Sequence, residues 1–558
     1  MELKKTARID LLKERMLSQP RYVSMEQAMI ITRAYQRHEE EPVILKRAYA
    51  LHDALCELEI GIEPQELIVG NRTKGVRYGV VFPESGISWV DQELETLPTR
   101  PQDKFLVRPE DVQTFREVIK PYWKGKSLED VLKKRYGKEI SALSTVVKIN
   151  QKDHAQGHIC PNVREWLEKG PAGLKEEAQQ HLLDCKEEQR PFYESILLVM
   201  DGVCRFLMRY HDELQKEAKQ HPDWKQDMIE TAEICKALSK RPAETFHEAV
   251  QSMWILFVVL HMESNASSFS PGRLDEILYP YYRKDRELGR LDAQRALDII
   301  ECLWLKFNQI VYLRNKNSAK YFAGFPIGFN IAVGGQDVHG EDVCNELSFL
   351  FLLAQEHIGL PQPNLSVRLH RGTGDALLKK AVRVVAKGSG MPQFFNDEAI
   401  IAELEKLGIS HQDAMDYAIV GCVELTTQGN NLGWSDAAMF NLNKVLELTL
   451  HHGRCLLTNQ QLGPDLGGLD TYESYEELES AFDAMIDHFL QRMIPACEEV
   501  EKAHIDILPS PFLSSVIDDC MEQGMDVTRG GAHYNLSGIQ MIQVANLADS
   551  LAAIKALV

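Results

Sequence analysis

From about residue 320 onward, short apolar runs that end in polar loops alternate with stretches of helical spacing. The helical stretch at 375–388 lies between two such runs. This alternation predicts strands joined by helices, an arrangement in which strand ends and loops carry the functional site. Earlier residues have mostly helical patterns. The sequence therefore predicts an α/β sheet or barrel with helices around it. The apolar runs lie at 322–335, 360–370, 389–398 and 416–425.

The chain length and the absence of linkers predict one large unit. The sequence has 558 residues, of which 44% are hydrophobic, a share typical of a folded globular protein. No Pro/Ser-rich linker, low-complexity stretch or internal repeat divides it. We therefore expect a single domain that spans residues 1–558.

The charge balance excludes several classes of partner. Acidic residues number 82 and basic residues 62, which gives a formal net charge of −20. Such a surface repels phosphate backbones and anionic lipids, so neither nucleic acid nor a membrane is an expected partner. No apolar run is long enough to span a bilayer, and the first residues carry charge throughout. These features predict a cytoplasmic protein.

The cysteines are too scattered for a disulfide framework or a zinc site. There are 11 of them, an odd number, and no CxxC pair occurs. We expect no bound metal and mostly reduced, buried thiols.

One cysteine has a more informative context than the others. The apolar run Tyr417–Val420 predicts a buried strand that Gly421 ends, so Cys422 follows a strand end and Glu424 comes two residues later. In extended backbone, residues i and i+2 face the same side, which would point this thiol and this carboxylate into one cavity. Composition alone favours the simpler reading of a buried cysteine beside a solvated glutamate.

Several segments, in order along the chain, together resemble the glycyl radical enzymes. The run GCVE at the cysteine, followed by WSDAAMFN, resembles their thiyl-radical loop. The resemblance covers about residue 20 to the end of the chain and implies a ten-stranded α/β barrel surrounded by helices. The other matching segments are ELIVGNRT at 66–73, GH at 157–158, ESNASSFSPGRLD at 263–275, MPQFFND at 391–397 and RGGAHYN at 529–535.

Within this family, the residue after the cysteine separates two branches. Pyruvate formate-lyase-like enzymes carry two adjacent cysteines, whereas Val423 follows Cys422 here. The Cys-x-Glu pattern resembles the dehydratase-like branch. The chain is most similar to "formate acetyltransferase 2"-type proteins and glycerol dehydratase, although it reads GCVEL where many dehydratases have GCVEP.

The resemblance to glycerol dehydratase also implies a pocket. Asp436, 14 residues beyond the cysteine, and His158 match acidic and histidine pocket residues of that enzyme. Ser268 matches a serine that follows a histidine in that enzyme, and Ser267 replaces this histidine, so the hydrogen bonding around the substrate is expected to differ. Both serines are expected to contribute to substrate binding. Asn265 lies in the same segment and is expected to contribute to substrate binding.

The implied reaction is radical elimination of water from a small polyol or related hydroxylated compound. Cys422 would become a thiyl radical and take a hydrogen atom from the substrate. Glu424 would accept a hydroxyl proton, and Asp436 or His158 would protonate the leaving group, help of a kind worth roughly 10²–10⁴-fold.

The resemblance also implies the means of activation. A radical S-adenosylmethionine activating enzyme with a 4Fe–4S cluster would install the glycyl radical, and a homodimer is expected. The family's radical glycine lies in a C-terminal loop resembling RVxGY, which residues 1–558 lack. We therefore expect a C-terminally truncated pyruvate formate-lyase-like domain without the glycine radical domain and with an incomplete barrel. The isolated chain is expected to be inactive.

Three alternatives stay open at this stage. The first is a different lyase or transferase chemistry, either formate C-acetyltransferase-like or cleavage of a C–N or C–S bond. The second is an inactive fragment or a subunit that needs a separate glycyl radical domain. The third is an unrelated helical scaffold, against which the ordered set of segments argues.

Overall fold

The most apolar run of the sequence forms the middle of a fully buried helix, α11 (Phe246–Glu263). Thr245 begins this helix with a capping box, in which its hydroxyl accepts the N–H of Glu248 and the Glu248 side chain bonds back to the Thr245 backbone. Because the middle of α11, residues 253–260, is apolar on every side, it has to be covered all round. The helices that pack against it are α3 (Val43–Glu57), α8 (Val163–Asp184), α10 (Lys225–Leu238), α12 (Leu274–Glu287) and α13 (Ala293–Phe307).

The structure is a computed structural model that describes all residues except 1–2, 324–326 and 558. Three positions of the predicted run 322–335 therefore lie outside the described residues. The helices up to Phe322 are α1 Ala7–Ser18, α2 Glu26–Arg37, α3 Val43–Glu57, α4 Ser88–Glu93, α5 Pro109–Thr114, α6 Lys120–Trp123, α7 Leu128–Leu143, α8 Val163–Asp184, α9 Arg190–Glu217, α10 Lys225–Leu238, α11 Phe246–Glu263, α12 Leu274–Glu287, α13 Ala293–Phe307 and α14 Lys316–Phe322. The later helices are α15 Glu346–Ile358, α16 Asp375–Val384, α17 Asp397–Lys406, α18 His411–Met415, α19 Leu442–Leu450, α20 Tyr475–Ile507, α21 Pro511–Ser514, α22 Cys520–Gln523 and α23 Val544–Leu557.

The strands confirm the predicted change near residue 320 from mostly helices to alternating strands and helices. Most of them follow it, and two helices, α15 and α16, join the parallel strands β4, β5 and β6. In chain order the strands are β1 Val23–Ser24, β2 Gly79–Val80, β3 Val147–Ile149, β4 Asn330–Gly334, β5 Asn364–Leu369, β6 Gln393–Asn396, β7 Ala418–Val420, β8 Glu424–Thr426, β9 Trp434–Asn441 and β10 Ser537–Ile542.

The α/β class is confirmed, but the described residues do not form a closed barrel. Their strands make four separate sheets, with the orders β1-β2, β10-β9-β3, β4-β5-β6 and β7-β8. Strand β7 lies against β4, and β8 lies against β9, without a backbone ladder between them. Strands β7 and β8 pair with each other as an antiparallel hairpin.

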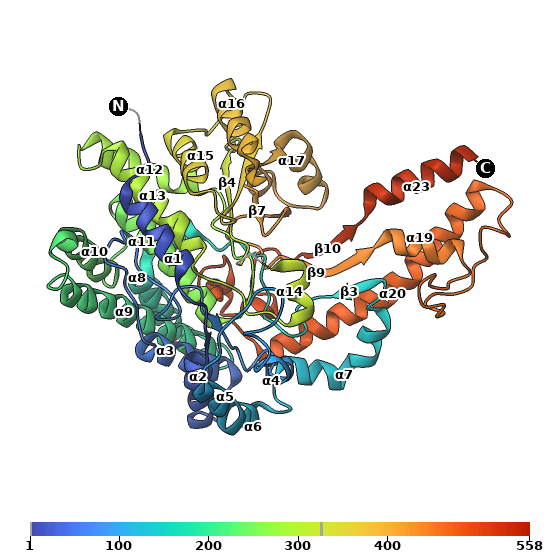
Figure 1. Cartoon of the computed structure of the whole chain (residues 1–558), viewed down its shortest axis with the longest axis horizontal. Coiled ribbons are helices and arrows are strands. Elements are labelled where there is room, and N and C mark those ends of the chain that lie inside the picture. The colour runs from blue at the N-terminus through green and yellow to red at the C-terminus, as the bar shows by residue number, and fades with distance from the viewer. Residues whose placement is uncertain (1–2, 324–326, 558) are drawn as a thin grey trace.

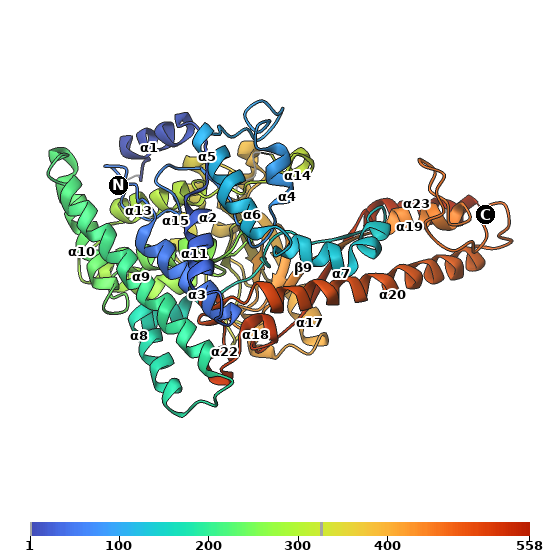
Figure 2. The same ribbon diagram turned by 90° about the horizontal axis from the view of Figure 1, so that it is seen from below.

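The C-terminal elements form an arm that projects from the helical body (Figures 1 and 2). Helices α19, α20 and α23 lie in this arm, and α7 packs along α20. Strand β10 pairs with β9 on one side only among the described residues, and Leu547 is the one buried residue of α23. None of the described helices combines the length and apolar content needed to cross a membrane.

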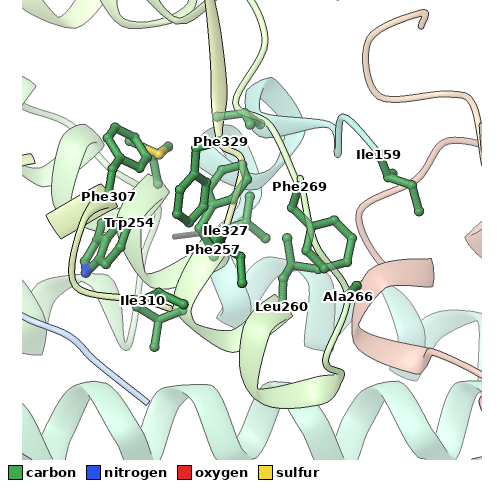
Figure 3. Close-up of a cluster of buried hydrophobic side chains, with 14 of the residues drawn as sticks. Ile159, Trp254, Phe257, Leu260, Ala266, Phe269, Phe307, Ile310, Ile327 and Phe329 are labelled. Carbon is green, nitrogen blue, oxygen red and sulfur yellow. The ribbon is translucent and has the colours of Figure 1, made fainter. Parts of the chain in front are cut away.

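The buried core extends to the loops that follow α11 and precede β4. Figure 3 shows Trp254 and Phe257 of α11 close to Phe329, which lies immediately before β4. The rings of Phe257 and Phe329 meet edge to face with centroids 5.9 Å apart. Ile159 and Phe269 belong to the same cluster. Since these are the neighbours of two predicted site residues, the core anchors both loops.

Candidate active site on a hairpin turn

Cys422 lies at the tip of a tight antiparallel hairpin between β7 and β8. Val420 pairs with Glu424, which leaves three residues, 421–423, in the turn. The buried strand and its end at Gly421 are confirmed. The extended geometry assumed for Cys422 and Glu424 is wrong, because this segment turns. The two residues come together for another reason: the Glu424 Oε2 folds back and accepts the N–H groups of Cys422 (2.9 Å) and Val423 (3.0 Å).

The missing side chain of Gly421 makes room for two neighbouring groups. Its φ is +59°, a conformation that favours glycine. A Cβ atom at this position would lie 2.4 Å from Cδ2 and 2.7 Å from Nε2 of His158, and 2.9 Å from Oε2 of Glu424. The histidine ring and the carboxylate therefore pack directly against the backbone of the turn.

The backbone of His158 is bonded to the loop that follows α11. Its N–H donates to the Ser267 carbonyl at 3.0 Å, and Gly157 leaves space there, since a Cβ on it would lie 1.8 Å from the same oxygen. Ser268 donates its N–H to the Ile327 carbonyl at 2.9 Å. The two loops thus cross beside the hairpin. Nδ1 of His158 is buried and has no hydrogen-bond partner among the described residues.

Asp436 brings a second carboxylate toward the cysteine from β9. Its Oδ1 accepts a hydrogen bond from Asn150 Nδ2 at 2.7 Å. Burial raises the pKa of Asp436, and the charge of Glu424 adds to this, while His158 opposes it. A buried carboxyl group whose pKa is raised beside a second carboxylate suits the role of an acid.

The same two carboxylates act on the thiol. Cys422 is accessible, although protein atoms surround the turn. This desolvation first, and the charges of Glu424 and Asp436 second, raise the pKa of Cys422 from 9.0 to about 11. The group is therefore a protonated thiol at neutral pH, not a thiolate.

The contacts of the remaining predicted substrate residues do not show whether they bind substrate. The oxygen of Asn265 is already engaged, because Ala155 donates its N–H (2.9 Å) and Ser85 its hydroxyl (3.0 Å) to it. Ser267 contacts His158 through its backbone carbonyl. Roles for Asn265, Ser267 and Ser268 in substrate binding stay predictions.

Several side chains around the turn were missed by sequence reasoning. Gln540 of β10 donates to Oε1 of Glu424, and Asn330 and Asn364 both donate to the Gly421 carbonyl. A signal for Asn330 was present, since it opens the otherwise apolar strand β4, whereas β5, which Asn364 opens, also contains Ser366 and Arg368. Gln540 gave no local signal, because its position depends on the pairing of β10 with β9.

Comparison with known proteins identifies the family of this chain. The model of the pyruvate formate lyase-like family matches residues 3–558. The chain belongs to this family. The pyruvate formate lyase-like chain is 31% identical over 569 residues to a (2S)-3-sulfopropanediol dehydratase of Klebsiella oxytoca, with 99% of this chain and 69% of that protein covered. It is 29% identical to an isethionate sulfite-lyase of Oleidesulfovibrio alaskensis, with 96% and 68% covered.

A solved structure supports the same placement. The glycerol-bound B12-independent glycerol dehydratase from Clostridium butyricum superimposes with a TM-score of 0.95 at 35% identity, and the match covers 100% of this chain and 72% of that one. The predicted membership of the dehydratase branch of glycyl radical enzymes is thereby confirmed. The pyruvate formate lyase-like fold is likewise confirmed over the whole chain.

Proposed function

We propose that this chain carries the hydrogen-abstracting cysteine of a radical lyase that eliminates water from a small polyol or a related hydroxylated compound. The observation that carries the proposal is the placement of Cys422 on a hairpin tip, where its N–H is bonded to Glu424 and where the charges of Glu424 and Asp436 both act on its thiol. The similarity to glycerol and sulfopropanediol dehydratases supports the same reaction class.

The protonated state of Cys422 suits hydrogen-atom transfer. A thiyl radical forms when an S–H group gives up a hydrogen atom, so the thiol has to keep its proton. Nucleophilic cysteines have the opposite environment, since positive charges lower their pKa and supply the thiolate. The raised pKa of Cys422 and the apolar neighbour Val423 therefore both argue against acyl transfer through this residue.

The surrounding groups supply the proton transfers. The glycyl radical that an activating enzyme installs in this family supplies the unpaired electron. Once Cys422 has taken a hydrogen atom from a hydroxyl-bearing carbon, Glu424 accepts the proton of that hydroxyl. Asp436, whose raised pKa favours its acid form, protonates the hydroxyl that leaves from the neighbouring carbon. His158 offers its free Nδ1 to the substrate.

The proposal is tested with enzyme that has been activated anaerobically, with the radical glycine supplied by the full-length protein or by a complementing chain. Glycerol, 1,2-propanediol, isethionate, and pyruvate with coenzyme A are offered separately. An aldehyde from a diol is the expected product, and Cys422→Ser should yield none. Sulfite from isethionate would instead assign C–S cleavage, as in the sulfite-lyase relative. Acetyl-coenzyme A and formate would overturn the proposal.

A further inference from the structure

The carbonyl immediately before Cys422 accepts hydrogen bonds from two buried side-chain amides. Asn330 Nδ2 donates to the Gly421 oxygen at 3.1 Å, and Asn364 Nδ2 donates to it at 2.7 Å. Both asparagines are almost completely buried, with 0% and 1% of their surface exposed. A carbonyl oxygen has two lone pairs, so these two amides saturate it.

The backbone ladder fixes the relative position of the two amides. Asn330 and Asn364 are register partners at the first residues of the parallel strands β4 and β5. Side chains at paired positions of adjacent parallel strands lie on the same face of the sheet. The pair therefore presents two amides, side by side, to one atom of the hairpin.

Neighbouring donors also fix which end of each amide faces the turn. The hydroxyl of Ser366 donates to Oδ1 of Asn330 at 2.9 Å, and Gln362 Nε2 donates to Oδ1 of Asn364 at 3.3 Å. With both oxygens occupied from behind, the NH₂ groups face the Gly421 carbonyl. A flipped amide would place oxygen against oxygen and leave a buried acceptor without a partner.

The opposite side of the same glycine is blocked as well. The ring of His158 and the carboxylate of Glu424 occupy the space where a Cβ of Gly421 would be. The turn is thus held from one side by two hydrogen bonds and from the other by van der Waals contact. These contacts restrain the backbone from which the Cys422 side chain projects.

We propose that Asn330 and Asn364 are positioning residues that hold the Cys422 thiol in its reactive direction by binding the Gly421 carbonyl. The importance of that direction rests on the function proposed above, because hydrogen abstraction needs the sulfur close to one substrate carbon. The positioning itself is a property of the chain as it stands and can be measured without turnover.

The test is hydrogen exchange of the turn amides, followed by mass spectrometry of overlapping peptides that cover 417–426. The N–H groups of Cys422 and Val423 are bonded to Glu424 only while the turn keeps its shape. Asn364→Asp replaces the donating NH₂ by an oxygen that repels the carbonyl. We expect exchange at these amides to accelerate about tenfold, the effect of losing about one buried hydrogen bond. If Asn364→Asp folds poorly, Asn330→Ser takes its place in the test. Its side chain is smaller and uncharged, and it should also accelerate exchange at these amides.

A matched control separates positioning from a general loss of stability. Gln251 is also fully buried, and its Nε2 donates to the Val69 carbonyl at 2.7 Å, in a segment that does not contact the turn. Gln251→Glu should lower the unfolding temperature and leave exchange at 422–423 unchanged. Unchanged turn exchange in folded Asn364→Asp and Asn330→Ser would overturn the positioning role, whatever reaction the enzyme catalyses. In activated enzyme, Asn330→Ser should lower kcat at least tenfold with little change in KM. An equal fall in kcat in a Gln251→Glu enzyme would also overturn the proposal.

Discussion

Replacing Glu424 by glutamine should make Cys422 more reactive toward alkylating reagents, although it should stop turnover. The carboxylate lies beside the thiol and disfavours the thiolate. Burial is the largest of the causes that raise the pKa of Cys422 from 9.0 to about 11, so Glu424 accounts for less than half of this rise. We therefore expect Glu424→Gln to lower the pKa by at most about one unit, which corresponds to about 1.4 kcal/mol.

The expected change in rate is smaller than the change in thiolate concentration. Because pH 8 lies far below the pKa of this thiol, a fall of one unit in the pKa raises the thiolate fraction about tenfold. A less basic thiolate is also a weaker nucleophile, with a Brønsted coefficient of about 0.4–0.5, and the net acceleration is about threefold. The sign follows from the removal of a negative charge, which stabilises the thiolate relative to the thiol.

The assay is the pH dependence of iodoacetamide alkylation, resolved by peptide mass spectrometry because the chain has 11 cysteines. In wild type the rate at Cys422 should keep rising up to about pH 11. Glu479→Gln serves as the control, since it removes the same charge from an exposed position of α20. A wild-type midpoint near pH 7, or alkylation of Glu424→Gln that is no faster than wild type, would refute the electrostatic account of the thiol.

Three further predictions concern the turn and the radical. In urea denaturation, Gly421→Ala should lower the free energy of unfolding by about 2 kcal/mol more than Gly408→Ala. Both glycines have positive φ, but only Gly421 packs against His158. Equal losses in the two variants would contradict this contact. Cys422→Ser should unfold like wild type and yet give no product in activated enzyme, since an O–H bond is too strong for the same hydrogen relay. Residues 1–558 expressed alone with an activating enzyme should give no glycyl radical doublet in electron paramagnetic resonance, and a stable doublet would show that a glycine of this segment takes that role.

The position of the cysteine could be predicted from the sequence because its determinants are local. The apolar residues before Gly421 indicate a buried strand, and the glycine ends it. The change from helices to alternating strands near residue 320 was visible for the same reason, since periodicity records which faces are buried.

The geometry around the cysteine depends on residues far apart in the chain. Whether residues 421–423 extend or turn is decided by the pairing of Val420 with Glu424 and by the bonds from Asn330 and Asn364. The arrangement of strands into separate sheets likewise depends on which edges pair. Neither property leaves a periodic pattern in the sequence.

Deuterium transfer tests the central role of Cys422 most directly. Activated enzyme is given 1,2-propanediol that carries deuterium on its terminal hydroxyl-bearing carbon, and the propanal is analysed by mass spectrometry and nuclear magnetic resonance. If Cys422 removes this deuterium and returns it after water has left, the label should appear on the neighbouring carbon of the product, and Cys422→Ser should form no propanal. Propanal whose label has stayed wholly in place, or that Cys422→Ser forms at the wild-type rate, would contradict the account.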